Sequence, residues 1–177
     1  SYSGYWYCQG SGAHFAVGGL VDWAGDDTYK CGAQVAMGGA HDWSVAWMVD
    51  AAGNDRYEAG DLSLGAGNMN GIGLFLDLQG EDFYRVSPNP NRSMGAARIT
   101  TWGSLREAQM NAGVFLDCGG RDTYEGIRGA NDSTWRSPMD HPELGLPSEN
   151  GVGMDCETKG VCPVRIVFHG ERVLNGL

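Results

Sequence analysis

The sequence has no long apolar segment, few basic residues and few prolines. No hydrophobic run approaches the ~20 residues needed to cross a bilayer, so no membrane span is expected. Lys and Arg number 12 against 22 Asp and Glu, and the net charge of -10 argues against nucleic acid, anionic membranes and polyanionic substrates as partners. Only 6 prolines and no Gly-X-Y period accompany the 29 glycines, which excludes collagen and a Pro-rich disordered chain. This glycine content predicts many tight turns.

Five cysteines in an acidic, Trp-rich chain favour an oxidising compartment. The expected location is therefore extracellular or at the cell surface, with the periplasm as a further option. Cys156 is positioned to close a small loop with Cys162 or to pair with Cys118, and the pairing of the five cysteines stays open. The chain starts at Ser1 without a signal peptide, as expected of a mature cleavage product or a trimmed chain.

One pattern, D-x-x-G-x-D-x-Y, occurs four times, each time after two or three apolar residues. The four copies are Asp22–Tyr29, Asp50–Tyr57, Asp77–Tyr84 and Asp117–Tyr124. Their first aspartates are separated by 28, 27 and 40 residues. This spacing indicates a repeat of about 27 residues, with an insertion of about 13 residues before the fourth copy.

The apolar stretch of each repeat is short, rich in β-branched or aromatic residues, and followed by a glycine-containing turn, which predicts a strand. Residues 98–110 are the one modest helical candidate. Units without helices cannot bury a face alone and are expected to stack. The sequence therefore predicts an all-β, parallel β-solenoid (β-helix) of about 27-residue coils with two irregular insertions. An irregular β-sandwich or a propeller-like fold is the alternative.

A single repeat domain is expected over residues 1–177. Its predicted parts are an aromatic N-terminal cap (1–12), four coils (13–125), and a degenerate fifth coil with a C-terminal cap (126–177). Residues 87–92 and 131–150 form the irregular loops, and long loops on a rigid scaffold are usual places for binding.

The repeated aspartates predict a cation site. Stacked coils would place the carboxylates of one column about 4.8 Å apart, where each adjacent pair repels by roughly 3 kcal/mol at an effective dielectric near 20. Ca²⁺ accepts several oxygen ligands at about 2.3–2.6 Å and would relieve this repulsion. The predicted ligands are Asp22, Asp27, Asp50, Asp55, Asp77, Asp82, Asp117 and Asp122. The second Asp of each motif is the better ligand and the first the better turn cap.

The alternative for these residues is purely structural. Asp at the start of D-x-x-G is a favoured turn residue that hydrogen-bonds backbone amides, and Gly supplies a positive φ. Tyr would then stack on Tyr of the next coil.

The half-motif G-x-D-x-Y, seen in Gly25–Tyr29, Gly53–Tyr57, Gly80–Tyr84 and Gly120–Tyr124, resembles the second half of the nonapeptide repeat of secreted RTX proteins. In that family the coils form a parallel β-roll with calcium between turns. The resemblance implies calcium ligands at Asp27, Asp55, Asp82 and Asp122. Here an Asp replaces the first Gly, and the motif recurs about every 27 residues instead of every nine.

Two further patterns bear on function. His14, His41 and Asn68 recur at intervals of 27 residues and predict a polar column, either a satisfied polar stack or a weak site for a transition metal or acid–base chemistry. Exposed aromatics beside acidic groups suit carbohydrate stacking. The candidates for this role are Trp23, Trp43, Trp102 and Trp135.

The favoured hypothesis is a non-catalytic, exported, calcium-stabilised β-solenoid module, serving as a structural or binding subunit for a partner protein or a glycan. Exposed strand edges at its ends would allow end-to-end or larger assembly. The alternative is a polysaccharide lyase or hydrolase on a β-helix scaffold, by analogy of fold alone. Basic residues that could assist such chemistry lie in the loops instead of in a repeat column, so the sequence leans away from an enzyme.

Overall fold

The computed structural model describes residues 1–88, 92–98, 111–126, 129–136, 151–157, 165–167 and 173–175. Within these ranges the chain is nearly all β, with no α-helix, and its sheets are open and mostly parallel. The prediction of an all-β chain with parallel strands is thus confirmed. The helical candidate at 98–110 lies almost wholly outside the described residues. No helix in the described part is long and apolar enough to cross a membrane.

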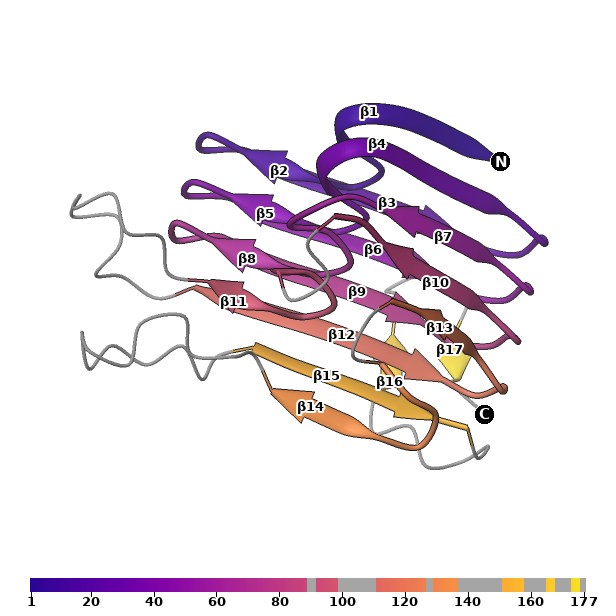
Figure 1. The fold of residues 1–177 in the computed structure, drawn as a ribbon. Coiled ribbons are helices and arrows are strands. Elements are labelled where there is room, and N and C mark those ends of the chain that lie inside the picture. The colour runs from indigo at the N-terminus through magenta and orange to yellow at the C-terminus, as the bar shows by residue number, and fades with distance from the viewer. Residues whose placement is uncertain are drawn as a thin grey trace.

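From β1 to β13, successive strands along the chain go in turn to three sheets, here called A, B and C (Figure 1). Sheet A has the order β1-β4-β7-β10-β13 and consists of β1 (Tyr2–Cys8), β4 (Thr28–Ala36), β7 (Arg56–Ala59), β10 (Phe83–Val86) and β13 (Thr123–Glu125). Sheet B has the order β11-β8-β5-β2 and consists of β2 (Gly12–Ala13), β5 (Ala40–His41), β8 (Gly67–Asn68) and β11 (Ala97–Arg98). All neighbours in both sheets are parallel.

Sheet C has the order β14-β15-β12-β9-β6-β3. It consists of β3 (Val17–Asp22), β6 (Val45–Asp50), β9 (Ile72–Asp77), β12 (Ala112–Cys118), β15 (Gly151–Cys156) and β14 (Thr134–Arg136). Only β14 runs antiparallel, against β15. A separate antiparallel pair joins β16 (Arg165–Val167) to β17 (Val173–Asn175). The prediction of an irregular loop over 131–150 is wrong at β14, because these residues pair with β15 and cover the edge of sheet C.

The strand register aligns the repeated residues. In sheet C the first aspartate of each motif faces the next one, in the series Asp22, Asp50, Asp77, Asp117 and Asp155. In sheet A the aligned tyrosines are Tyr2, Tyr29, Tyr57, Tyr84 and Tyr124. The fourth repeat keeps this register although it follows an insertion, and β15 places Asp155 as a fifth member.

The column of His14, His41 and Asn68 is offset by one residue from its prediction. His41 and Asn68 are strand partners, but the partner of His41 on the other side is Ala13. The first interval in this part of the chain is 28 residues, and the matching tripeptides Gly12–His14 and Gly39–His41 are therefore not in register. His14 instead places its Nδ1 2.9 Å from Oδ2 of Asp42.

The core follows from the alternation of side chains along the strands of sheet C. Met48, Phe75 and Phe115 point to one side and pack with the buried tyrosines of sheet A. The next residue of each strand, Val49, Leu76 or Leu116, belongs to a second apolar cluster. Sheet C is thus buried on both faces near its carboxyl ends, which explains why these strands end in continuous apolar runs.

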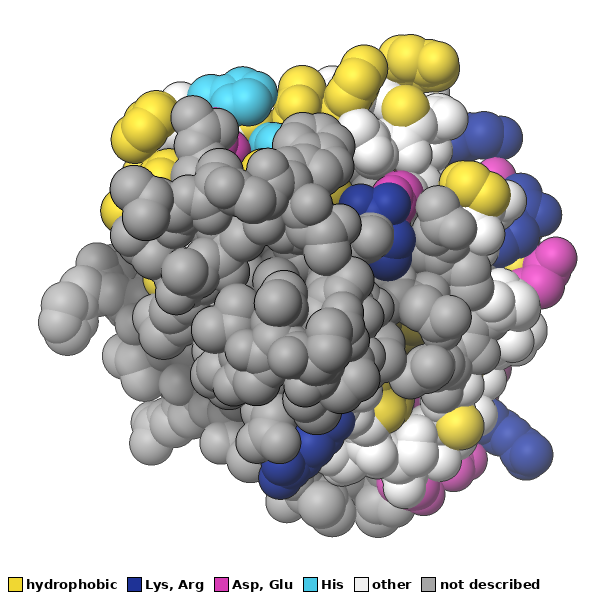
Figure 2. All heavy atoms as spheres, turned by 60° about the vertical axis from the view of Figure 1, so that its left-hand side comes forward, with side chains coloured by type: hydrophobic (Ala, Val, Ile, Leu, Met, Phe, Trp, Pro, Cys, Tyr) yellow, Lys and Arg dark blue, Asp and Glu magenta, His cyan; other side chains and the backbone are white. Residues whose placement is uncertain are grey.

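Residues 1–12, expected to be a cap, contain β1, the edge strand of sheet A. Several of its side chains and their neighbours are exposed, among them Tyr5, Trp6, Tyr7 and Phe15. Figure 2 shows hydrophobic and histidine side chains gathered along the upper rim of one face. This end of the strand stack therefore presents an aromatic surface.

Candidate metal centre

The eight predicted aspartates all lie at one corner of the structure, where the chain passes from a strand of sheet C to a strand of sheet A. The first Asp of each motif is the last residue of a strand of sheet C, or the last but one in the case of Asp117, and the second immediately precedes a strand of sheet A. The residues between them form the turn. Stacking of the turns brings the carboxylates of successive repeats together.

The motif glycine allows the turns to approach closely. A Cβ on Gly80 would lie 2.0 Å from the carbonyl oxygen of Gly53 in the preceding turn and 2.6 Å from Oδ1 of Asp82. A Cβ on Gly53 would meet Gly25 and Asp55 in the same way. The spacing G-x-D is thus explained, because the carboxylate two residues later folds back against the glycine.

The second aspartates form a hydrogen-bonded row, here called the inner row. The backbone amides of Asp27, Asp55 and Asp82 each donate to Oδ1 of the second aspartate in the following repeat, at 2.6 Å. The last amide, that of Asp122, donates to Oδ1 of Asn131 at 2.7 Å. The row therefore ends on a neutral side chain that the sequence analysis did not identify.

The first aspartates accept hydrogen bonds from the stacked tyrosines. Oδ2 of Asp50 accepts the Tyr29 hydroxyl at 2.7 Å, and Oδ2 of Asp77 accepts the Tyr57 hydroxyl at 2.7 Å. Tyr124 donates in the same manner to Asp155. Ring centroids of neighbouring tyrosines lie 4.9 to 5.2 Å apart. The predicted stacking of Tyr on Tyr is confirmed.

Two groups of three carboxylates result. Asp55, Asp77 and Asp82 form the first group, and Asp82, Asp117 and Asp122 form the second. Within each group one oxygen per residue lies within 4.8 Å of the others. Each group combines two second aspartates of neighbouring turns with one first aspartate, whereas the sequence analysis considered each column separately.

These carboxylates are buried and incompletely satisfied. Asp77 and Asp117 are 0% exposed, and Asp82 is 2% exposed. Neither oxygen of Asp117 accepts a hydrogen bond of regular geometry, although the Tyr84 hydroxyl lies beside it. Oδ2 also lacks a partner in Asp55, Asp82 and Asp122. A carboxylate in such surroundings requires a proton or a cation.

Burial raises the pKa of every member of the two groups, and the neighbouring carboxylates raise it further. The pKa is about 7 for Asp55, about 8 for Asp82 and about 7 for Asp122. For Asp77 and Asp117 it lies well above its ordinary value. In each case the backbone or tyrosine hydrogen bonds oppose the shift without cancelling it.

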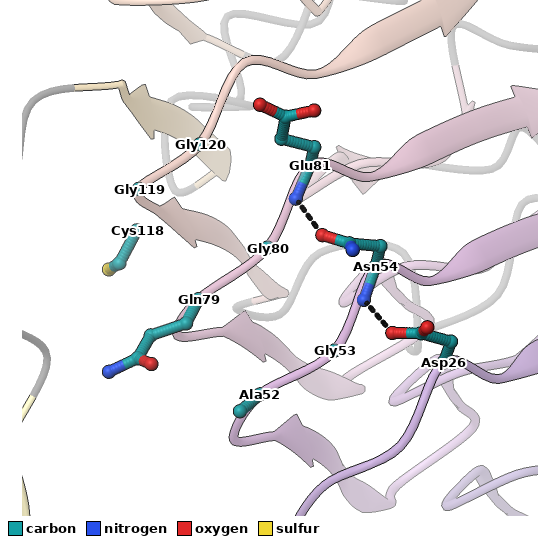
Figure 3. A pocket seen from close by; sticks show the side chains of 10 residues that line it. All are labelled: Asp26, Ala52, Gly53, Asn54, Gln79, Gly80, Glu81, Cys118, Gly119 and Gly120. Atoms are coloured by element: carbon teal, nitrogen blue, oxygen red, sulfur yellow. Dashed lines mark hydrogen bonds between the residues drawn. The ribbon is translucent and has the colours of Figure 1, made fainter.

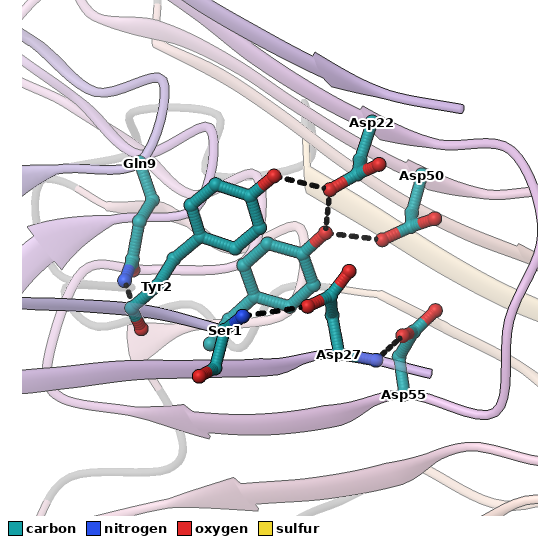
Figure 4. Close-up of polar contacts among 8 residues, drawn as sticks. Ser1, Tyr2, Gln9, Asp22, Asp27, Asp50 and Asp55 are labelled. Carbon is teal, nitrogen blue, oxygen red and sulfur yellow. Dashed lines mark hydrogen bonds and ion pairs between the residues drawn. The ribbon is translucent and has the colours of Figure 1, made fainter. Parts of the chain in front are cut away.

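The other predicted ligands lie outside these groups. Asp22 has a lowered pKa because, although burial raises it, hydrogen bonds from Tyr2 and Tyr29 outweigh that effect. Oδ1 of Asp27 accepts a hydrogen bond from the amino group of Ser1 at 2.7 Å. Figure 4 shows this end of the row, where Oδ1 of Asp55 accepts the amide of Asp27 and Oδ2 of Asp50 accepts the Tyr29 hydroxyl of the preceding repeat. Asp50 is buried, but it joins neither group of three.

A groove of about 520 Å³ lies at the same corner, along the turns themselves (Figure 3). In it the amides of Asn54 and Glu81 donate to the side chains of Asp26 and Asn54, both at 2.9 Å. We call these three residues the outer row. Its residues come one position before those of the inner row in each motif. Its amides donate to the preceding repeat, whereas those of the inner row donate to the following one. None of the eight predicted ligands lines the groove.

The predicted tryptophans differ in exposure, and the cysteines differ in pairing. Trp23 and Trp43 are exposed, whereas Trp135 packs on the core beside Phe115. Trp102 lies outside the described residues. Cys118 is disulfide-bonded and Cys156 is free, so neither pairing expected for Cys156 occurs.

No family model matches this chain, and no curated protein or solved structure shows significant similarity to it. A functional assignment therefore depends on the carboxylate groups and the strand arrangement.

Proposed function

We propose that the chain is a β-solenoid module stabilised by hard divalent cations, with Ca²⁺ as the preferred ion. The three sheets would be the faces of the solenoid, because each repeat adds one strand to each sheet in the same order. In this proposal the module is a non-catalytic scaffold, and its exposed aromatic end and loops bind a partner protein or a glycan. The disulfide of Cys118 supports an exported protein.

The observation that carries the proposal is the group of Asp82, Asp117 and Asp122. Three ionised carboxylates within 4.8 Å repel by about 3 kcal/mol per pair at an effective dielectric near 20. Two oxygens on opposite sides of a Ca²⁺ ion are separated by roughly 4.8 Å, twice the usual bond length, so one ion could contact all three. Asp117 has both oxygens available for this role.

Calcium fits this site better than magnesium. Ca²⁺ accepts irregular sets of six to eight oxygens, whereas Mg²⁺ requires a near-ideal octahedron at about 2.0–2.1 Å and retains several waters. Backbone amides hold Oδ1 of Asp82 and of Asp122, and all three carboxylates of the group are buried. The site therefore offers an irregular set of carboxylate oxygens, which suits Ca²⁺ better than Mg²⁺.

The test is thermal unfolding of the purified chain in EDTA, in millimolar Ca²⁺ and in millimolar Mg²⁺. Calcium should raise the midpoint, because a ligand at 100 times its Kd adds about 2.7 kcal/mol per site. Asp117→Asn should remove the part of this increase that comes from the group of Asp82, Asp117 and Asp122, and keep the part that comes from the group of Asp55, Asp77 and Asp82. It should also raise the midpoint in EDTA, because it removes a buried carboxyl whose pKa lies well above its ordinary value. Asp26→Asn, on the exposed outer row, is the matched control and should keep the calcium response.

If the wild-type midpoint is the same in EDTA and in calcium, and calorimetry detects no calcium binding, the carboxylates share protons instead. The aspartates would then serve as turn caps, and the solenoid would be stabilised by hydrogen bonds and stacking alone.

A further inference from the structure

Two cysteine side chains meet between the first two strands of sheet A. Cys8 ends β1, and Cys31 lies within β4. Gly4 is the strand partner of Cys31, and a Cβ on Gly4 would lie 2.6 Å from Sγ of Cys8. Strand β1 therefore bends sharply between these positions, where its register with β4 shifts and Tyr7 has a φ of 49°. The backbone of Cys8 pairs with Ala36, but the bend brings its side chain back over Gly4, next to Cys31.

The thiol of Cys8 lies over Gly4, the strand partner of Cys31, and therefore beside the Cys31 thiol. The Cys8 S–H lowers the pKa of Cys31 to about 7, against the opposing effect of burial. Sγ of Cys31 also lies 3.3 Å from the carbonyl oxygen of Tyr5. Cys31 is 6% exposed, and Cys8, on the neighbouring edge strand β1, is half-buried. A thiolate is the reactive form in disulfide exchange, and here it has a second thiol beside it.

We propose that Cys8 and Cys31 form a redox-active dithiol that small-molecule disulfides such as oxidised glutathione convert to an intramolecular disulfide. The Cys31 thiolate attacks one glutathione sulfur, forming a mixed disulfide and releasing a glutathione thiolate. That thiolate takes the proton of Cys8, whose sulfur then attacks Cys31 and displaces the second glutathione. Overall, two protein thiols are oxidised and one glutathione disulfide is reduced to two thiols.

The bond would fasten the end of the strand stack. Among the described strands, β1 is paired on one side only, with β4. A disulfide between them closes a loop over residues 9–30 and restricts the unfolded chain. The oxidised protein therefore holds its aromatic end strand in place, whereas the reduced protein allows that strand to open.

The test uses the full chain in a series of glutathione buffers of defined ratio, followed by acid quenching, alkylation in denaturant and peptide mapping by mass spectrometry. The linked Cys8–Cys31 peptide should form at ratios where Cys156 still accepts the alkylating reagent. Cys156 is a suitable internal control because it is a buried free thiol whose pKa is raised by burial. Oxidation should also raise the thermal midpoint of the wild type.

Matched variants separate the pair from general thiol chemistry. Cys156→Ser should leave both the linkage and the rise in midpoint unchanged, whereas Cys8→Ser should remove both. Recovery of Cys8 and Cys31 as alkylated or singly glutathionylated residues in the most oxidising buffer, with the Cys118 disulfide intact, would overturn the proposal. Linkage that forms only in urea would do the same, because it would show that the folded geometry keeps the sulfurs apart.

Discussion

Asp82 shows how one side chain connects structure and chemistry in this protein. Its Oδ1 accepts a hydrogen bond from the amide of Asp55 and so aligns two turns. Its Oδ2 is buried without a hydrogen-bond partner, and Asp82 belongs to both groups of three carboxylates. The first oxygen explains why this position needs a side-chain acceptor, and the second explains why its negative charge is costly without an ion. A structural and a cation-binding role are therefore compatible in the same residue.

The raised pKa values predict how the stability of the ion-free protein changes with pH. The folded carboxyls retain protons up to about pH 7 or 8, whereas unfolded Asp titrates near 3.9. The folded state thus binds more protons in this window, and its stability must fall as pH rises from about 4 to about 8. Thermal unfolding in EDTA across this range measures the effect.

Asp82→Asn keeps the Oδ1 acceptor but removes one titrating group. The free energy of unfolding should then fall less steeply with pH, by up to about 1.4 kcal/mol per pH unit, the value for one proton. Asp26→Asn should leave the slope unchanged. A stability that increases steadily from pH 4 to pH 8 in EDTA would contradict the assigned pKa directions.

At the scale of elements, the tyrosines of sheet A connect it to the ends of the strands in sheet C. Each ring lies between its neighbours in a stack, and such pairs contribute about 0.5–1.5 kcal/mol beyond burial. The hydrogen bonds made by the tyrosine hydroxyls differ from one repeat to the next. That of Tyr57 donates to Asp77 at 2.7 Å, whereas that of Tyr84 makes no hydrogen bond of regular geometry.

This difference predicts unequal effects from the same substitution. Tyr57→Phe should destabilise the ion-free protein by about 1–3 kcal/mol, because Asp77 loses its hydroxyl donor in a buried site. Tyr84→Phe should change the stability by less than about 0.5 kcal/mol, since no such bond is lost. Denaturant unfolding in EDTA gives both values. Equal losses would mean that the Tyr84 hydroxyl is also bonded.

The sequence predicted the turns better than the contacts between them. The spacing of Asp22, Asp50 and Asp77 gave the correct register, because the period of a repeat is directly visible in the chain. The match of Gly12–His14 with Gly39–His41 was misleading by one residue, because local identity does not fix register when intervals are 28 and 27. The joint groups of first and second aspartates could not be anticipated, because they depend on how the turn folds in three dimensions.

At the scale of the whole molecule, the repeat is the unit of construction. Asp50 and Asp77 occupy equivalent positions in sheet C, so the chain enters and leaves residues 51–77 in the same register. These residues contribute one strand to each of the three sheets. The arrangement is quasi-one-dimensional, with each repeat in contact mainly with its neighbours.

A variant lacking residues 51–77 should therefore fold, with a lower thermal midpoint and a β-rich circular dichroism spectrum. It should also lose the group of Asp55, Asp77 and Asp82 and keep that of Asp82, Asp117 and Asp122, so that calorimetry finds fewer calcium ions per chain. A deletion of residues 51–71 shifts the register and should prevent cooperative unfolding. If both variants behave alike, the repeat is not an independent unit.

The inner and outer rows have a mechanical consequence. Amides of the inner row donate toward later repeats, and those of the outer row donate toward earlier ones. A force that pulls neighbouring turns apart along the stack loads bonds of both directions at once, one residue apart. The two gaps between the first three turns are each crossed by one bond of each row, so separating these turns requires two hydrogen bonds to break together in each gap.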